Sequence, residues 1–288
     1  MRLERFRNNM WWMLIWACTN APEPKSPPLN LGVQKPPAIP NAVTPDEMRG
    51  VSPPVPASAT ITEAEKRLTQ VVEAHTRDPA NPWAIGHGLV AEGRNMTLSN
   101  GQSAVEWLFE NYAERQRFGD TWILSFPEAR KTVRIEPHPD LLLKALTDAG
   151  ISPSLPVTVK GHAHTVQDLY RGVLAETFFD SQTGDSSYGA PNEMPWSLFG
   201  IASWSAPNLK WTNINGRTSS LDDLTDRVEK NLNDATQFIA EAKASGIGFK
   251  KRRQGIFAFT CGGSHLIQGV IHAKILGFGT PNPEGPFK

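Results

Sequence analysis

Two helix starts that share a Pro-Trp dipeptide constrain the fold of this chain most strongly. Pro82-Trp83 and Pro195-Trp196 each open an apolar segment. Proline is favoured at the first position of a helix, because the N–H that it lacks has no partner there in any case. A turn glycine follows each start at a similar separation, Gly101 in the first copy and Gly216 in the second. The sequence therefore predicts a repeated structural unit.

A second helix is expected behind each turn. A serine or threonine followed three residues later by an acidic residue is typical of a capping box, in which side chain and backbone cap each other's N–H groups. This pattern occurs at 103–106, 165–168 and 220–223, and another copy at 62–65 predicts a helix over about 61–76. We expect the second helices to be amphipathic, with one over 103–117 and one running to about residue 244.

Two further copies complete the pattern. A middle unit has its turn at Gly161, and the preceding helix, 140–149, is ended by Gly150. A last, partial copy begins at Phe257 and aligns Cys261 with His87. Chance recurrence is the alternative to true repetition, since capping boxes and Asn-Gly turns are frequent.

Repeated helix pairs predict a mainly α fold, an α/α helical-hairpin array with short β-hairpins between the helices. In the first unit the helix over 82–93 is almost entirely apolar or small, whereas 103–117 is amphipathic, which favours inner and outer helices. Over about residues 80–275 this architecture resembles the α/α-toroid group, which includes terpenoid cyclases, protein prenyltransferases and lanthionine cyclases. Their diagnostic motifs are missing, and the few hairpins predict an incomplete toroid or open arc.

The N-terminus has the pattern of an export signal. Arg2, Arg5 and Arg7 precede the apolar run 10–17, and Cys18 follows it. A cysteine at this position resembles the lipobox of bacterial lipoproteins, and the resemblance implies a diacylated Cys18 as first mature residue. The protein would then be lipid-anchored to a membrane in the cell envelope, outside the cytoplasm. The alternatives are an uncleaved anchor and a misplaced start.

The segment after the predicted signal is rich in proline. Residues 19–58 contain 11 of the 24 prolines, which removes backbone donors and predicts an extended spacer. The predicted organisation is a signal peptide (1–17), a lipid-anchored Pro-rich linker (18–58) and an α-helical repeat domain (59–288). Lys+Arg and Asp+Glu are both 29, so no net charge favours nucleic acid as a partner.

The strongest chemical candidate is the pair Cys261 and His265. Four-residue spacing would place both side chains on one helix face, with His87 at the equivalent position of the first unit. Thiolate and imidazole are zinc ligands, so Cys261, His265 and His87 are the predicted metal ligands. The resemblance to prenyltransferases implies a catalytic zinc with such mixed ligands. Alternatively Cys261 is a nucleophile with His265 or His87 as its base, or simply a small buried residue.

Tryptophans are the candidates for ligand contact. Trp83, Trp196 and Trp204 can line an apolar or sugar-stacking cleft, and core packing is the alternative role. Two functions follow from these residues. The first is binding of an apolar or polymeric ligand in a concave helical cleft. The second is a toroid-type enzyme, possibly zinc-dependent, that acts through Cys261, His265 and His87.

Overall fold

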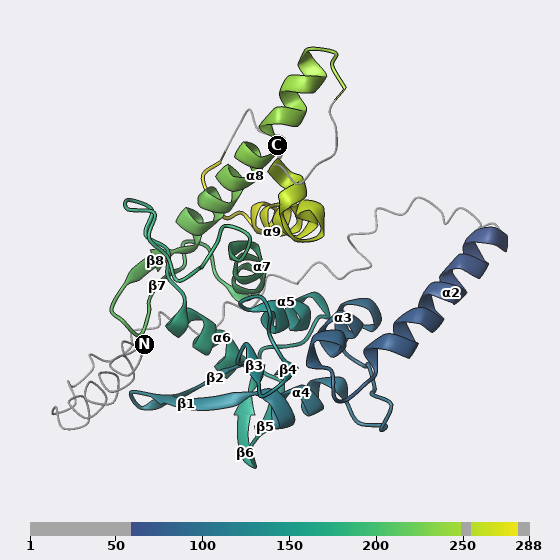
Figure 1. Cartoon of the computed structure of the whole chain (residues 1–288). Coiled ribbons are helices and arrows are strands. Elements are labelled where there is room, and N and C mark those ends of the chain that lie inside the picture. The colour runs from purple at the N-terminus through teal and green to yellow at the C-terminus, as the bar shows by residue number, and fades with distance from the viewer. Residues whose placement is uncertain (1–58, 249–254, 282–288) are drawn as a thin grey trace, which may run out of the picture.

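The computed structural model describes residues 59–248 and 255–281. The predicted signal peptide, the Cys18 lipidation site and the linker lie outside these ranges. The described residues form eight α-helices and four two-stranded antiparallel hairpins (Figure 1), which confirms the expected mainly α class. No helix among the described residues is long and apolar enough to cross a membrane.

The helices are α2 (Ala59–Thr76), α3 (Pro82–Glu92), α4 (Ala104–Tyr112), α5 (Leu141–Asp148), α6 (Val166–Glu176), α7 (Met194–Trp204), α8 (Leu221–Ala244) and α9 (Ser264–Ile275). Two short 3₁₀ helices, η1 (Gly255–Ala258) and η2 (Thr260–Gly263), precede α9. The hairpins pair β1 (Glu114–Phe118) with β2 (Thr121–Ser125), β3 (Ala129–Arg130) with β4 (Val133–Arg134), β5 (Pro156–Val159) with β6 (His162–Thr165), and β7 (Lys210–Thr212) with β8 (Thr218–Ser220).

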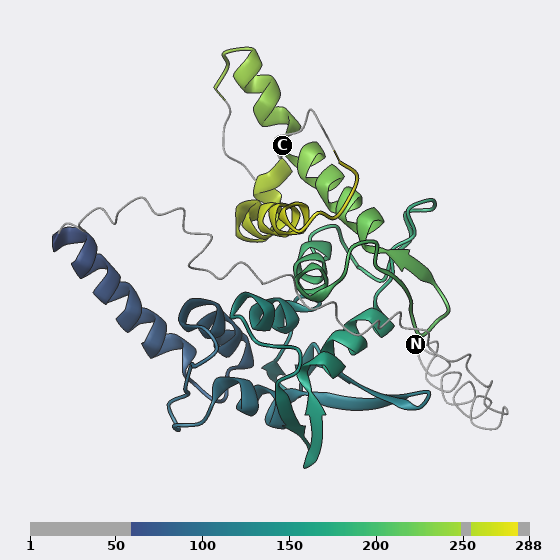
Figure 2. The same cartoon turned by 180° about the vertical axis from the view of Figure 1, so that it is seen from behind.

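Four helices, which we call the apolar helices, pack side by side in chain order: α3 against α5, α5 against α7 and α7 against α9. Figures 1 and 2 show α5 between α3 and α7 from both sides. Small residues permit the close contacts. A Cβ at Gly86 would lie 3.0 Å from Leu142 Cδ2, and one at Gly269 would lie 2.9 Å from the Pro195 carbonyl oxygen. The buried side chains of the four apolar helices supply much of the hydrophobic core.

Further core contacts come from the amphipathic helices and two hairpins. α4 packs on β5, α6 on β2, and α8 on α7 and α9. Gly172 of α6 lies directly on β2, because a Cβ there would overlap the carbonyl oxygen of Leu124. Only glycine allows the helix to approach the strand this closely.

Most predicted helices and turns are confirmed. Gly101, Gly161 and Gly216 have φ of 80°, 77° and 74°, as tight turns require. The helix expected over 103–117 is shorter, since α4 ends at Tyr112. The following residues instead pair as β1 with β2, so tertiary pairing overrides the helical pattern there.

The prediction that Cys261 and His265 share one helix face is wrong. Helix α9 begins only at Ser264, so Cys261 precedes it. Cys261, Gly262 and Gly263 have φ of 53°, 66° and 85°. Three consecutive left-handed residues cannot continue a right-handed helix, so the helical spacing does not apply across them.

A C-terminal strap, residues 278–280, follows α9 and lies on α8. Phe278 is buried in the core. The Gly279 N–H donates to Asp222 Oδ1 at 2.8 Å, and the Thr280 N–H donates to Asp226 Oδ1 at 2.7 Å. These two hydrogen bonds fix the strap against the first turns of α8.

Candidate functional site

Three aromatic side chains form a continuous stack, which we call the ring row: His138, Trp196 and His265. His138 lies just before α5, while Trp196 and His265 belong to the first turns of α7 and α9. The His138 and Trp196 rings are 4.9 Å apart between centroids and nearly parallel, and Trp196 and His265 are 3.9 Å apart. The row therefore joins the beginnings of three neighbouring apolar helices.

Helix starts position these side chains. Pro139 follows His138 just before α5, and Pro195, the second residue of α7, directly precedes Trp196. Local chemistry therefore helps to fix where α5 and α7 begin. The His138 ring is held by Glu193, with 3.1 Å between Nδ1 and Oε2. Trp196 is only 4% exposed, so its ring packs between the two histidines and offers no free face to a ligand.

His265 is neutral at ordinary pH. Burial, together with the electrostatic effect of Lys144, His87 and His138, lowers the pKa of His265 to about 4, while a hydrogen bond with Gln268 opposes this shift. A neutral imidazole packs against an indole without the cost of burying a charge. The same neutral ring can act as a hydrogen-bond donor, an acceptor or a metal ligand.

One end of the ring row opens on a groove of about 610 Å³, which we call the Trp83 groove. Trp83 is 44% exposed, and its ring lies 4.2 Å from that of His87. The His87 Nδ1 atom is 2.8 Å from the Trp83 carbonyl oxygen, so the pair is fixed within α3. The groove is lined by Asp78, Ala80, Asn81, Trp83, Thr132, Val133, Arg134, Pro137 and His138.

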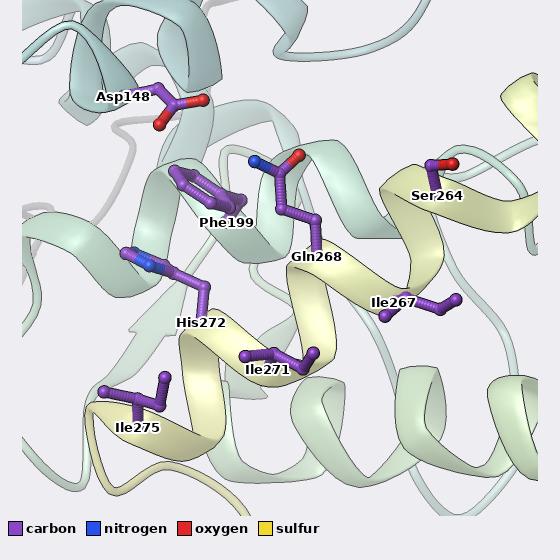
Figure 3. Close-up of a pocket in the computed structure, with 8 residues that line it drawn as sticks. All are labelled: Asp148, Phe199, Ser264, Ile267, Gln268, Ile271, His272 and Ile275. Carbon is purple, nitrogen blue, oxygen red and sulfur yellow. The ribbon is translucent and has the colours of Figure 1, made fainter. Parts of the chain in front are cut away.

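A second groove, of about 530 Å³, lies along α9 and is called the α9 groove. Its lining residues are Asp148, Phe199, Ser264, Ile267, Gln268, Ile271, His272 and Ile275. Figure 3 shows Gln268 and His272 extending from α9 toward Phe199 and Asp148. The Phe199 and His272 rings stack at 3.8 Å with 12° between their planes, and the Lys144 ammonium lies 4.5 Å from the Phe199 centroid.

A cluster of carboxyl groups, missed in the sequence, lies beside the ring row. Glu136, Asp140 and Glu176 line a small cavity of about 20 Å³, enough for one water molecule. Ser197 of α7 donates a hydrogen bond to Asp140 Oδ2, and the Leu142 N–H donates to Glu136 Oε1 at 2.8 Å.

Protonation in this cluster is shifted. Burial and the Glu176 charge raise the pKa of Asp140 to about 7, against the opposing effect of the Ser197 hydrogen bond. Burial and the Asp140 charge raise the pKa of Glu136 well above its usual value. Asp140 also has a left-handed backbone, with φ of 61°. The sequence signal that could have revealed this cluster is the pair Glu136 and Asp140, which flank the dipeptide His138-Pro139 before α5.

The structure brings together only some of the predicted site residues. Trp83 and Trp196 are linked through His138, which lines the Trp83 groove and stacks on Trp196. Trp204 lies elsewhere, edge-on to Tyr170 of α6 at 6.1 Å and packed against the core. Cys261 is exposed and carries a free thiol.

The predicted zinc ligands do not form a metal site here. Within residues 59–248 and 255–281, no group of three or more His, Cys, Asp or Glu side chains is arranged to hold a metal ion. Zinc binding by His87, Cys261 and His265 therefore stays a prediction without support from this geometry.

Comparisons with models of known families, with curated proteins and with solved structures give no match to this chain. Its function is therefore inferred from the ring row, the two grooves and the carboxyl cluster.

Proposed function

We propose that this is an exported, lipid-anchored protein whose helical domain binds an apolar or polymeric ligand along the surface of the apolar helices. In this proposal α3, α5, α7 and α9 are the inner helices of an incomplete α/α toroid, and α4, α6 and α8 are outer helices. The order in which the apolar helices pack supports such an arc.

The relation of the ring row to the grooves carries the proposal. His138, at one end of the row, lines the Trp83 groove. Ser264, the neighbour of His265 at the other end, lines the α9 groove. Two grooves that flank one row of stacked rings suit an extended ligand better than a compact one.

Ligand chemistry follows from the lining. Ile267, Ile271 and Ile275 give the α9 groove an apolar wall, whereas Trp83 offers a half-exposed ring next to polar side chains. An aromatic face and aliphatic side chains bind apolar or flat ligand surfaces, and a few polar groups orient them. The expected ligand is therefore a chain with apolar or flat units.

Binding is tested on the full chain by calorimetry, with a long-chain fatty acid as the apolar probe and a soluble oligosaccharide as the polymeric one. Trp83→Ala should weaken binding of whichever probe the wild-type protein binds by about tenfold, in the range typical of a buried aromatic contact. Trp122→Ala is the matched control, since Trp122 is 38% exposed but lies on β2. Absence of binding to both probes would contradict the proposal.

The anchor has its own test. Cys18→Ser should release the protein from membranes into the soluble fraction, because the acylated thiol is gone. Retention of this variant in the membrane fraction would exclude lipidation at Cys18 as the anchor.

A toroid-type enzyme is the second candidate. One observation favours it: His87 and His138 lie close enough to His265 for their charges to lower its pKa. Metal analysis of the purified chain tests the zinc-dependent form. Stoichiometric zinc that is lost in Cys261→Ser and His265→Gln would support this second candidate. A fully folded chain that contains no metal and has no reactive Cys261 would exclude this enzyme and leave binding as the remaining candidate function.

A further inference from the structure

We propose that Ser203 and His272 form a nucleophile–base pair that hydrolyses esters whose apolar acyl chain lies in the α9 groove, which His272 lines. The inference rests on the proposed function in one respect, namely that the α9 groove admits an apolar ligand. It adds a reaction, and it assigns that reaction to residues other than Cys261, His265 and His87.

The hydrogen bond between the two side chains is the central observation. Ser203, in the last turn of α7, has its Oγ 2.8 Å from His272 Nε2 of α9. The same Oγ is 2.9 Å from the carbonyl oxygen of Phe199. The hydroxyl has one proton, so it donates either to Phe199 or to Nε2. The second arrangement is the one in which His272 can take the proton of a serine nucleophile.

His272 is held in position for this role. Its ring stacks flat on Phe199 at 3.8 Å, which fixes the plane of the imidazole. Burial lowers the pKa of His272, the Asp148 charge raises it, and the Lys144 charge lowers it. The ring is therefore neutral near pH ~7, as a general base must be before it accepts a proton.

The groove beside His272 suits an acyl chain. Ile267, Ile271 and Ile275 follow one another at four-residue spacing along α9, so their side chains line one strip of the helix (Figure 3). The groove volume of about 530 Å³ is in the range of small-molecule sites. Gln268 extends into the same space and supplies an amide N–H that can donate to a carbonyl oxygen.

The reaction balances with water as the only co-reactant. Ser203 Oγ bonds to the ester carbonyl carbon while its proton passes to His272 Nε2. The carbon–oxygen bond to the alcohol breaks, and the alcohol leaves with that proton. Water then attacks the acyl-serine and gives a proton to His272. The acyl–Oγ bond breaks, Ser203 regains the proton, and a carboxylic acid leaves.

The test is covalent labelling of the full chain with an alkyl fluorophosphonate, with the modified residue located by mass spectrometry. Label on Ser203 is expected, with loss of at least about tenfold in labelling rate in His272→Gln. Ser205→Ala is the matched control, since Ser205 is on the same helix end and bonds to Tyr170 Oη at 2.8 Å without a histidine. This variant should label at the wild-type rate.

A second variant separates chemistry from folding. Ser203→Cys retains a nucleophile, so its alkylation by iodoacetamide should depend on His272 in a folded chain. The apolar-probe measurement is made in parallel. Wild-type protein that binds the fatty acid but takes no label on Ser203 overturns the hydrolytic pair and leaves the proposed function intact. Label on Ser203 without binding of either the fatty acid or the oligosaccharide contradicts the proposed function and keeps the pair.

Discussion

The imidazole of His138 lies flat on the indole of Trp196, with 4.9 Å between centroids and 6° between planes. Two residues beyond His138, Asp140 accepts a hydrogen bond from Ser197, the residue after Trp196. Two contacts therefore join the start of α5 to the start of α7: the stacked rings and the Asp140–Ser197 hydrogen bond. Asp140 and the ring row therefore lie at the same junction between α5 and α7.

The contribution of Asp140 to stability should fall as pH rises toward neutrality. Burial raises the pKa of Asp140 to about 7, so the folded protein holds a proton that the unfolded chain releases near pH ~4. This contribution is present at low pH and is lost as pH rises through about 7. Urea unfolding between about pH 5 and pH 8 should show the decrease, and Asp140→Asn should flatten it. The control is Glu110→Gln, an exposed carboxylate on α4. Equal slopes in all three proteins would contradict the prediction.

The histidine at the other end of the ring row has the opposite effect. The pKa of His265 is lowered from 6.5 to about 4, so the unfolded chain binds a proton that the folded chain excludes. The resulting stability is present above the unfolded pKa and is lost as pH falls from about 6.5 to about 4. We expect a loss of about 1–2 kcal/mol, reduced from the full shift because the side chain is partly solvated.

The neutral ring of His265→Phe should keep the contact with Trp196 and remove this acid-dependent loss. His75→Gln, a change at an exposed position of α2, serves as control. Urea titrations of the three proteins across this pH range measure the effect. An acid loss that persists unchanged in His265→Phe would show that other groups cause it.

The two Pro-Trp tryptophans should differ in their contribution to folding. Trp196 is 4% exposed, so Trp196→Ala leaves a cavity and should cost about 3–5 kcal/mol. Trp83 is 44% exposed, and Trp83→Ala should cost less than about 2 kcal/mol while it weakens ligand binding. Equilibrium unfolding in urea measures both. Equal costs would mean that the two helix starts have equivalent surroundings.

Gly172 should tolerate no side chain. Because a Cβ at this position overlaps the Leu124 carbonyl oxygen, Gly172→Ala must separate α6 from β2 and should cost at least about 2 kcal/mol. Gly189→Ala is the matched control, since a Cβ at Gly189 meets no atom within 4 Å. A thermal melt compares the two variants. A wild-type melting temperature for Gly172→Ala would contradict the close approach.

Sequence reasoning found what local chemistry determines. Asn81 caps α3 by accepting the Ala84 N–H at 3.1 Å, and the Thr165 N–H donates to Asp168 Oδ2 at 3.1 Å at the start of α6. Both helix starts are encoded within a few residues. The turn glycines could be predicted for the same reason, since a left-handed backbone in a tight turn is a local requirement that glycine meets.

The missed features depend on distant partners. The β1 strand reads Glu-Arg-Gln-Arg-Phe, which has no strand-like apolar alternation, and it forms because β2 pairs with it. The left-handed backbone at Cys261 has no local signature beyond the two glycines after it. The contact of Asp140 with Ser197 joins the residue before α5 to a residue of α7, so no spacing rule could reveal it.

The C-terminal strap sets a practical boundary for engineering. Phe278 is buried in the core, and the backbone N–H groups of the next two residues donate to aspartates of α8. A truncation before residue 278 would uncover apolar surface and leave those carboxylates without their donors. Engineered truncations, affinity tags and fluorescent fusions should therefore leave residues 278–280 in place.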